Sequence, residues 1–331
     1  STQAKTLFPY TTLFRSFDFI RQYLQKQKSS GLILGIGDDA AIIRPSHGFD
    51  LCFSADMLLK DRHFFSDTAP EDLAWKMLAV NISDMAAMGA TPKWVLLSAG
   101  LPELDENWLK RFCDSFFSLA QRFGITLIGG DTTKGDLVFN VTIIGELPQG
   151  QALRRDAAKD GDDIWVSGQI GSAAAALNCR LNTHTLPPDL FDRCHDRLLR
   201  PEPRVELGQA LLPIAHAAQD ISDGLAQDLG HILTASSVGA EISANALPVL
   251  EELKNVLPHE SWLSCALAGG DDYELVFTAP ECRRSEIQTI AGQCGVAVTP
   301  IGKINNTGRL KIIDSNGGEL KLTSLGFDHF G

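Results

Sequence analysis

The sequence predicts an α/β protein of two domains, and three observations support this fold class. First, the chain has 331 residues, which exceeds the usual size of one domain. Second, apolar runs of strand length alternate with segments of helical periodicity. Third, a polar and glycine-containing stretch at 147–162 interrupts this alternation near the middle of the chain. We therefore expect a domain boundary near residue 150.

Three segments are predicted to be helical. A helix over 70–88 begins at Pro70, a residue favoured in the first turn of a helix. A second helix over 105–123 places its large aromatic residues on one face and ends before Gly124. A third helix is expected over 224–236. Each predicted helix therefore has an apolar side that can pack against a sheet.

Five short apolar runs are predicted to be buried strands. They are LCFSAD (51–56), WVLLSAG (94–100), ITLIGGD (125–131), LVFNVTIIGEL (137–147) and DIWVSG (163–168). The first is expected to end at Asp56 and the third at Gly129, Gly130 and Asp131. An acidic residue at a strand end is either a cap or turn residue or a ligand-binding group.

Composition excludes several classes of protein. The formal net charge of −12 argues against a nucleic-acid or anionic-membrane partner, which clustered Lys and Arg would bind. The seven cysteines are odd in number and form no C-x-x-C pair, so a reducing cytoplasm is the expected compartment. No apolar run is long enough to span a bilayer. Residues 1–16 are predicted to be a leader outside the fold that is either disordered or not native to it.

Acidic residues are concentrated beside glycines or inside apolar runs. The segments are GIGDDAA (35–41), FSAD (53–56), LAVNISDMAAMGA (78–90), LIGGDTT (127–133), DISDGL (220–225) and LAGGDDYEL (267–275). A carboxylate in apolar surroundings is costly unless it is paired or holds a metal. Because cationic side chains are scarce in these segments, Mg²⁺ is the expected counter-charge.

Each segment also has a purely structural interpretation. Asp84, one turn after Asn81, could belong to a solvated helix stripe. The glycines and aspartates of 35–39 could form only a turn between a helix and a strand. Residues 129–133 could likewise form only a tight turn, not a place where a ligand approaches the backbone. The acidic residues of 220–223 could cap the following helix. Taken singly, none of these segments identifies a site.

Familiar catalytic signatures are missing from the sequence. There is no phosphate-binding P-loop, dinucleotide fingerprint or protein-kinase catalytic loop, and no H-E-x-x-H or G-x-S-x-G motif. His63 is notable only because it closely follows Asp56. Any nucleotide must therefore be bound by a different architecture.

Taken together and in order, these acidic motifs and the terminal GFDHF resemble the thiamine-monophosphate kinase family from residue 17 to 331. The resemblance implies a two-domain fold like that of aminoimidazole ribonucleotide synthetase. Its N-terminal sheet domain would be 17–149, which binds ATP and forms a homodimer, and its C-terminal α/β domain would be 150–331. It also implies a cytoplasmic enzyme that uses ATP and several Mg²⁺ ions to convert thiamine phosphate to thiamine diphosphate. K⁺ is left open as a further cation.

The resemblance assigns roles to individual positions. The implied metal ligands are Asp39, Ser54, the main chain of Ala55, Asp56, Asp84, Asp131, Asp220 and Asp223. The implied ATP-binding residues are Gly130, Asp131, Arg155 and Ser222, and the implied substrate-binding residues are His63, Asp271 and Ser324. No general base is expected, because the accepting phosphate oxygen is already ionised at neutral pH.

The sequence departs from the family pattern at three places. Arg15-Ser16-Phe17 replaces a Gly-Glu-Phe segment, Ala55 replaces a frequent Thr, and Ser324 occupies the place of an aromatic residue, with Phe327 as its alternative. Two competing hypotheses remain. One is a related ATP-dependent synthetase, although no cysteine precedes Cys52 where a selenophosphate synthetase would need one. The other is a non-catalytic scaffold, which should have lost these aspartates.

Overall fold

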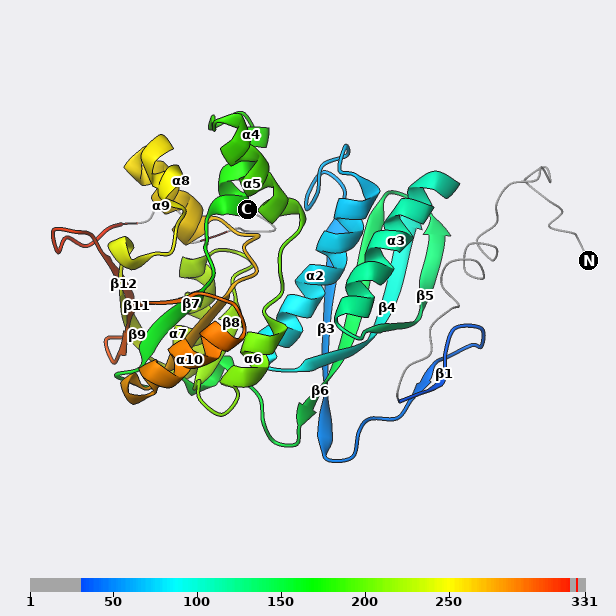
Figure 1. Cartoon of the computed structure of the whole chain (residues 1–331), viewed down its shortest axis with the longest axis horizontal. Coiled ribbons are helices and arrows are strands. Elements are labelled where there is room, and N and C mark those ends of the chain that lie inside the picture. The colour runs from blue at the N-terminus through cyan, green and yellow to red at the C-terminus, as the bar shows by residue number, and fades with distance from the viewer. Residues whose placement is uncertain (1–30, 322–325, 327–331) are drawn as a thin grey trace, which may run out of the picture.

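The computed structural model describes residues 31–321 and Gly326, and within them two large sheets lie side by side with helices packed around them (Figure 1). The predicted leader at 1–16, Ser324 and Phe327 lie outside the described residues. The strands are β1 (Leu32–Leu34), β2 (Ile42–Ile43), β3 (Phe49–Leu59), β4 (Thr91–Leu101), β5 (Thr126–Lys134), β6 (Val138–Pro148), β7 (Asp163–Ser167), β8 (Ala217–Asp220), β9 (Gly239–Ser243), β10 (Leu275–Ala279), β11 (Val298–Asn305) and β12 (Leu310–Ile313). The helices are α2 (Pro70–Met88), α3 (Glu106–Arg122), α4 (Ser172–Arg180), α5 (Pro188–Leu199), α6 (Val205–Leu211), α7 (Leu225–Ser236), α8 (Glu251–Val256), α9 (His259–Ala268) and α10 (Arg284–Gln293).

The first sheet has the strand order β3-β6-β4-β5, so β3 and β5 are its edges among the described residues. The pairs β3–β6 and β6–β4 are antiparallel, and β4–β5 is parallel. Helices α2 and α3 lie across one face of this sheet (Figure 1). That face is called the inner face here, and the opposite one the outer face.

Two strands continue past the residues at which we expected them to end. β3 runs on to Leu59 and β5 to Lys134, so Asp56 and Asp131 lie inside strands and the predicted ends are wrong. The cause is pairing with neighbouring strands: Asp56 pairs with Val141 across β3–β6, and Asp131 is opposite Ser98 across β4–β5. A partner strand can hold a polar residue in extended backbone that local sequence would place in a turn.

Helix α2 has the predicted bounds and is buried on nearly every side. Pro70 lies in its first turn, and Gly89 ends it in the left-handed conformation with φ of 73°. The N–H of Gly89 and that of Ala90 donate back to the last turn of the helix, which satisfies two of its terminal carbonyls. The burial on many sides arises because α2 packs between the first sheet and the C-terminal half. Polar side chains on α2 are therefore enclosed by protein.

Helix α3 follows the predicted amphipathic pattern. The Asp105 side chain accepts a hydrogen bond of 3.0 Å from the N–H of Trp108 and so caps the N-terminus. Phe112 stacks on Phe139 of β6 with ring centroids 5.1 Å apart. Burial of each such ring contributes roughly 1.5–3 kcal/mol to folding, which fixes α3 on the inner face.

The second sheet has the order β12-β9-β11-β7-β10-β8 and is mostly antiparallel, with β12–β9 its parallel pair. The predicted third helix corresponds to α7, directly after β8. The connection between β6 and β7 leads from one sheet to the other, and the boundary near residue 150 stays a prediction. One apolar core spans both halves, since Met77 and Leu78 of α2 belong to the same cluster as Trp165 and Phe277. None of the described helices has the length and apolar character needed to cross a membrane.

Candidate active site

Four predicted aspartates lie near one another where α2 meets both sheets. Asp56 is on the inner face of β3, Asp84 is in the last turns of α2, Asp220 ends β8, and Asp223 precedes α7. The charges of Asp84 and Asp223 act on Asp56, and the charges of Asp84 and Asp56 act on Asp220. We call these four residues the carboxylate group.

Hydrogen bonds hold this group in place. Ser54 Oγ donates to Asp84 Oδ2 at 2.5 Å, and Asn81 Oδ1 accepts from the N–H of Asp56 at 3.2 Å. The Asn81 amide also donates to the carbonyl of Met77 at 2.9 Å, so its orientation is fixed within α2. Asp84 is therefore not part of a solvated stripe, and that alternative is wrong.

A second contact joins α2 to the C-terminal half. Ser83 Oγ donates to Asp220 Oδ2 at 2.7 Å, and both residues are buried. The side chains of 220–223 do not cap α7, because its N-cap residue Gly224 has no side-chain cap. Instead Asp228 accepts from the N–H groups of Asp223 and Gly224, at 3.0 and 3.1 Å. The capping interpretation of 220–223 is therefore wrong; Asp220 instead accepts from Ser83, and the charge of Asp223 acts on Asp56.

The electrostatics of the group favour a bound cation. Burial, with the charges of Asp84 and Asp223, raises the pKa of Asp56 to about 7. Burial also raises the pKa of Asp84, against the lowering effect of the Ser54 hydrogen bond and the charge of Arg155. Burial and the charge of Asp84 raise the pKa of Asp220 well above its usual range. These carboxylates repel one another, and a divalent cation would relieve that repulsion.

The donor set also fits Mg²⁺. Carboxylate and hydroxyl oxygens are the ligands that Mg²⁺ prefers, and the group supplies both types from Asp84, Asp220 and Ser54. In the described part of the chain, no three acidic, histidine or cysteine side chains are already placed to share one ion. Because Mg²⁺ usually keeps several waters and completes its shell with substrate phosphates, two protein oxygens per ion are sufficient.

A cavity of about 410 Å³ opens beside this group. Its lining includes Ser54, Asp84 and Asp220, together with Arg154 and Arg155 from the connection before β7. Arg154 is paired with Asp156 at 2.8 Å between Nε and Oδ1, whereas the charge of Arg155 acts on Asp84. The lining of this cavity therefore combines carboxylate oxygens with guanidinium groups.

Asp131 is not brought to the carboxylate group. Three strand spacings separate β5 from β3, about 14 Å across the sheet. Alternation along the strands also places Asp131, opposite Ser98, on the outer face, whereas Asp56 is on the inner face. Asp131 is exposed, and its Oδ1 accepts from the N–H of Thr132 at 2.9 Å.

Gly130 and Asp39 are explained locally. A Cβ at Gly130 would lie 1.7 Å from the carbonyl oxygen of Leu97, and the φ of Gly130 is 147°. Glycine is therefore required here because the backbone of β4 approaches closely. Asp39 is exposed between β1 and β2, where its N–H donates to Asp38 Oδ1 at 2.9 Å. The segment 35–39 thus connects two strands, and its predicted place between a helix and a strand is wrong.

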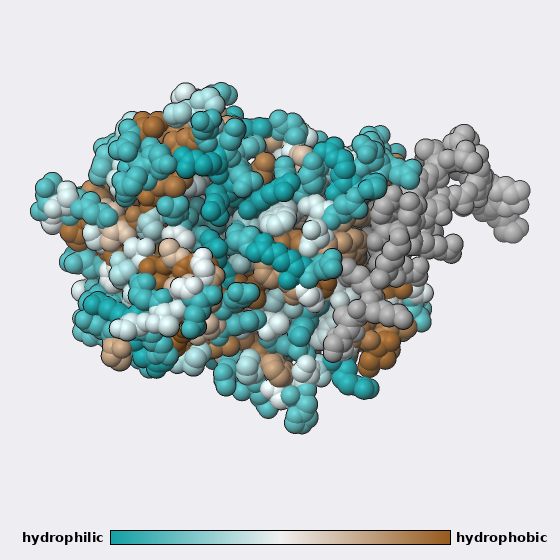
Figure 2. All heavy atoms as spheres, viewed as in Figure 1, coloured by the Kyte–Doolittle hydropathy of each residue, from teal (hydrophilic) through white to brown (hydrophobic). Residues whose placement is uncertain are grey.

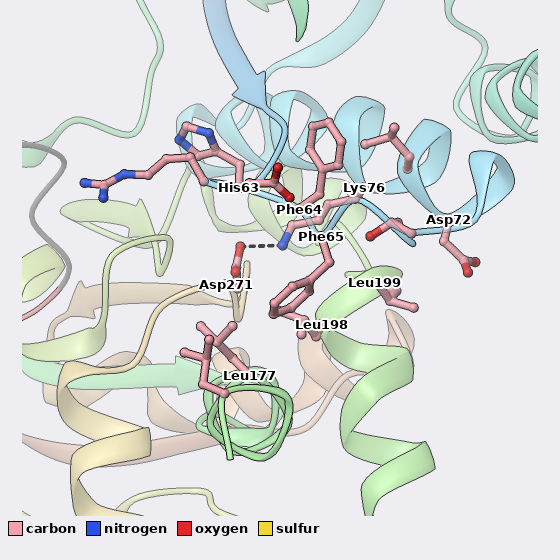
Figure 3. A pocket seen from close by; sticks show the side chains of 14 residues that line it. His63, Phe64, Phe65, Asp72, Lys76, Leu177, Leu198, Leu199 and Asp271 are labelled. Carbon is pink, nitrogen blue, oxygen red and sulfur yellow. Dashed lines mark ion pairs between the residues drawn. The ribbon is translucent and has the colours of Figure 1, made fainter. Parts of the chain in front are cut away.

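Two of the three predicted substrate residues lie in a second cavity of about 200 Å³ between the two halves (Figure 3). His63 and Asp271 line it, and the His63 Nδ1 accepts from the N–H of Leu59 at 3.0 Å. Asp61, Arg62 and Asp72 also line the cavity, and much of the rest of its wall is aromatic or leucine. These apolar residues are Phe64, Phe65 and Leu73 from the N-terminal half, and Leu177, Leu181, Leu198 and Leu199 from α4, α5 and the residue after α4.

The Asp271 loop links this cavity to the carboxylate group. The N–H of Asp271 donates to the carbonyl of Ser222, and the N–H of Tyr273 to that of Ile221, both at 2.8 Å. Ser222, predicted to contact ATP, therefore lies between Asp220 and Asp223 with its carbonyl turned to this loop. Ala55 lies on edge strand β3 with an exposed side chain. Because that side chain is a methyl group, only the main-chain oxygen of Ala55 could bind a metal ion.

Sequence analysis missed Lys76, which forms a 2.9 Å ion pair with Asp271 in this cavity (Figure 3). It also missed Ser83 and Asp228. The detectable signal for Lys76 was a lone cation inside the apolar run of α2, seven residues before Ser83 and so on the same side of the helix. Its partner Asp271 is too far away in the chain for any local pattern to find.

Comparison with known proteins gives consistent matches over most of the chain. Residues 37–147 match the family "AIR synthase related protein, N-terminal domain" and residues 159–315 match "AIR synthase related protein, C-terminal domain". The thiamine-monophosphate kinase of Escherichia coli is 43% identical over 318 residues, which cover 95% of this chain and 98% of that protein.

Solved structures agree with these matches. The crystal structure of the thiamine-monophosphate kinase from Stenotrophomonas maltophilia K279a is 44% identical, with a TM-score of 0.83 and coverage of 92% of this chain and 96% of that one. The structure of AaThiL complexed with AMPPCP and TMP is 28% identical, with a TM-score of 0.74 and coverage of 98% and 100%.

Proposed function

The chain belongs to the thiamine-monophosphate kinase family, and we propose that it transfers the terminal phosphoryl group of ATP to thiamine phosphate, giving thiamine diphosphate and ADP. The carboxylate group, with one cavity beside it and a second cavity joined to it by the Asp271 loop, is the observation that carries this proposal. One cavity suits the phosphates of a nucleotide and the other a partly apolar acceptor. The complex of AaThiL with AMPPCP and TMP supports both ligands.

In this proposal Asp56, Asp84, Asp220 and Asp223 hold Mg²⁺ ions, with Ser54 Oγ and the main-chain oxygen of Ala55 as further ligands. Such ions neutralise phosphate charge and align the donor with the acceptor. The mutual repulsion of the buried carboxylates supports this assignment. K⁺ as an additional cation can be tested by replacing it with Na⁺ in the assay.

The protein's own contribution is to hold and orient the reactants. We propose that Arg155 binds ATP phosphates in the larger cavity, next to Ser222, and that His63 contacts the acceptor in the smaller one. The His63 Nδ1 accepts the Leu59 N–H, so a neutral ring carries its proton on Nε2 and donates from that atom. The accepting phosphate oxygen is already ionised, so positioning and exclusion of water replace a general base.

We also propose a cytoplasmic homodimer formed through the outer face of the first sheet. The outer side of β3 exposes Phe53 and Met57, with 60% and 55% of their surface accessible. By contrast, the face of the molecule drawn in Figure 2 is mostly hydrophilic. Exposed apolar side chains on an edge strand are typical of an interaction surface. All seven cysteines carry free thiols, which supports a reducing compartment.

A dimer would also give a place to Asp131, proposed as a metal and ATP ligand, and to Gly130, proposed to bind ATP. Asp131 is on the outer face at the far edge of the sheet from Asp56, so it cannot complete the site of its own chain in this arrangement. We therefore propose that Asp131 binds metal and ATP in the site of the partner subunit. Asp39, on the β1–β2 connection, is proposed as a ligand that joins when the substrates bind.

Product analysis tests the proposed reaction. The protein is incubated with ATP, Mg²⁺ and thiamine phosphate, and thiamine diphosphate, ADP and free phosphate are quantified. One thiamine diphosphate per ADP without free phosphate is expected. ADP together with free phosphate would instead indicate a synthetase-like relative, and the absence of turnover with retained ATP binding would indicate a scaffold.

A further inference from the structure

Lys76 is an unusual residue because its charge is buried. Its side chain is only 5% exposed, and its ammonium group lies 2.9 Å from Asp271 Oδ1, whose side chain is 27% exposed. Taking an ammonium group out of water costs several kcal/mol unless a partner compensates it. The remainder of the cavity wall consists of phenylalanine and leucine side chains together with Asp61, Arg62, His63, Thr68 and Asp72. A stability role alone would be served as well by two apolar residues.

The position of the pair connects it to the reaction. Lys76 comes from α2 in the N-terminal half and Asp271 from the loop before β10 in the C-terminal half (Figure 3). Asp271 has a positive φ of 67° and Tyr273 one of 51°, conformations that cost free energy for residues other than glycine and that occur often at functional sites. The Tyr273 hydroxyl donates to Asp271 Oδ1 at 3.3 Å. The loop is therefore held so that the Asp271 carboxylate faces Lys76.

The cavity thus places a cation and an anion in contact where the two halves meet, within a lining that otherwise mixes apolar side chains with polar ones. Thiamine phosphate has the complementary charges: a thiazolium ring with a fixed positive charge and a phosphate that is anionic at neutral pH. A cationic ring suits apolar and aromatic walls beside a carboxylate, and an ammonium group is a strong donor to phosphate.

Building on the proposed function, we propose that Lys76 and Asp271 exchange partners when the substrate binds. Lys76 turns from Asp271 to the phosphate of thiamine phosphate, and Asp271 turns to the cationic thiazolium ring. Each charge of the pair keeps a partner of opposite sign throughout, so separation of the ion pair leaves neither the buried Lys76 nor the half-buried Asp271 uncompensated. Lys76 is then a substrate-binding residue that selects acceptors carrying both charges.

Partner exchange makes a distinctive prediction for incomplete ligands. Thiamine, which lacks the phosphate, would leave Lys76 without a partner. The phosphate ester of the neutral thiazole alcohol, which lacks the cation, would leave Asp271 without one. Both should bind more weakly than thiamine phosphate, because an unpaired buried charge is costly.

The test measures the affinity of these three compounds for the full chain, with Mg²⁺ and AMPPCP present, for the original protein, Lys76→Met and Asp271→Asn. In Lys76→Met, thiamine phosphate should bind at least about tenfold more weakly. Thiamine should bind more tightly, because Asp271 no longer has a competing partner. In Asp271→Asn, the preference for thiamine phosphate over the neutral thiazole phosphate should fall toward one. Lys110→Met, an exposed lysine of α3 with a 59% accessible side chain, is the matched control and should change none of these values.

Two outcomes would overturn the exchange. If Lys76→Met weakens all three ligands equally, the pair is only a structural latch between the halves. If Lys76→Met binds thiamine phosphate with the original affinity, Lys76 does not contact the phosphate. Should Lys76→Met fail to fold by circular dichroism, the double variant Lys76→Met/Asp271→Asn removes both charges of the pair together, and retained discrimination in that variant contradicts the proposal. Failure of the original protein to form thiamine diphosphate would refute the proposed function instead, so the two failures are separable.

Discussion

Ser83 of α2 donates a 2.7 Å hydrogen bond to Asp220 at the end of β8, and this contact joins the two halves of the molecule at the carboxylate group. Both side chains are buried. The same helix places Asn81 and Asp84 against β3, so one turn of α2 contacts both sheets. The spacing between Asp56, Asp84 and Asp220 therefore depends on a single rigid helix, not on a mobile loop.

Ser83→Ala should destabilise the fold and lower turnover together. The change removes a donor from a buried carboxylate, and such a loss typically costs about 1–3 kcal/mol. The measurement is the urea midpoint of unfolding, followed by the turnover number. Ser264→Ala, an exposed position in α9, is the matched control. A Ser83→Ala protein with the original midpoint would show that the hydrogen bond contributes nothing net.

Asp84→Asn should abolish turnover without loss of the fold. Asparagine keeps the shape and the Ser54 contact but removes the charge that would bind Mg²⁺, so the turnover number should fall at least about 100-fold. Because a buried charge is lost, the melting temperature in EDTA should stay equal or rise. Asp105→Asn retains a good cap for α3 and serves as the control. Full activity of Asp84→Asn would remove this residue from the proposed metal site.

Features set by interactions between residues close in the chain could be predicted from the sequence, and features set by interactions between distant residues could not. Helices over 70–88 and 106–122 follow from local periodicity, Pro70 and Gly124, and their predicted bounds agree with the structure to within a residue. The ends of β3 and β5 were wrong because strand length is set by partners such as β6 and β4 that are distant in the chain.

The site shows the same division. Asp84 and Asp220 could be found from their apolar surroundings, since a buried carboxylate requires a partner wherever it lies. The ion pair between Lys76 and Asp271 and the separation of Asp131 from Asp56 could not, because both depend on which strands and helices become neighbours. No local spacing contains that information.

Stability of the metal-free protein should fall as pH rises. Burial and neighbouring charges raise the pKa of Asp56 to about 7, above the value of about 3.9 in an unfolded chain. The folded protein therefore binds this proton more tightly, and the resulting stability is fully present below about pH 4 and lost as pH rises through about 7.

Melting temperatures in EDTA between pH 5 and pH 8 check this expectation. Asp56→Asn should flatten the profile, and Mg²⁺ should stabilise the original protein more at pH 8 than at pH 5, because only the ionised carboxylate binds it. An equally steep profile in Asp56→Asn would assign the pH dependence to other groups.

Mixing two inactive variants should restore activity if Asp131 acts on the partner's site. Asp131 lies on the outer face and three strands from Asp56, whereas Asp84 contacts Ser54 on the inner side of β3. In a dimer, Asp131→Asn and Asp84→Asn would each disable both sites when present alone. A mixed dimer would contain one site with both substitutions and one site with neither, because each site would take Asp84 from one chain and Asp131 from the other.

Random exchange of subunits makes about half of the dimers mixed, and half of their sites intact. The mixture should therefore recover about a quarter of the original activity, after mild denaturant has allowed exchange and been removed. Asp84→Asn mixed with Asp56→Asn is the control, since both residues would belong to the same chain's half of the site and every site would lack one of them. If the first mixture stays as inactive as the control, Asp131 does not complete the partner's site, and its conformation next to Thr132 must change before it can act within its own chain.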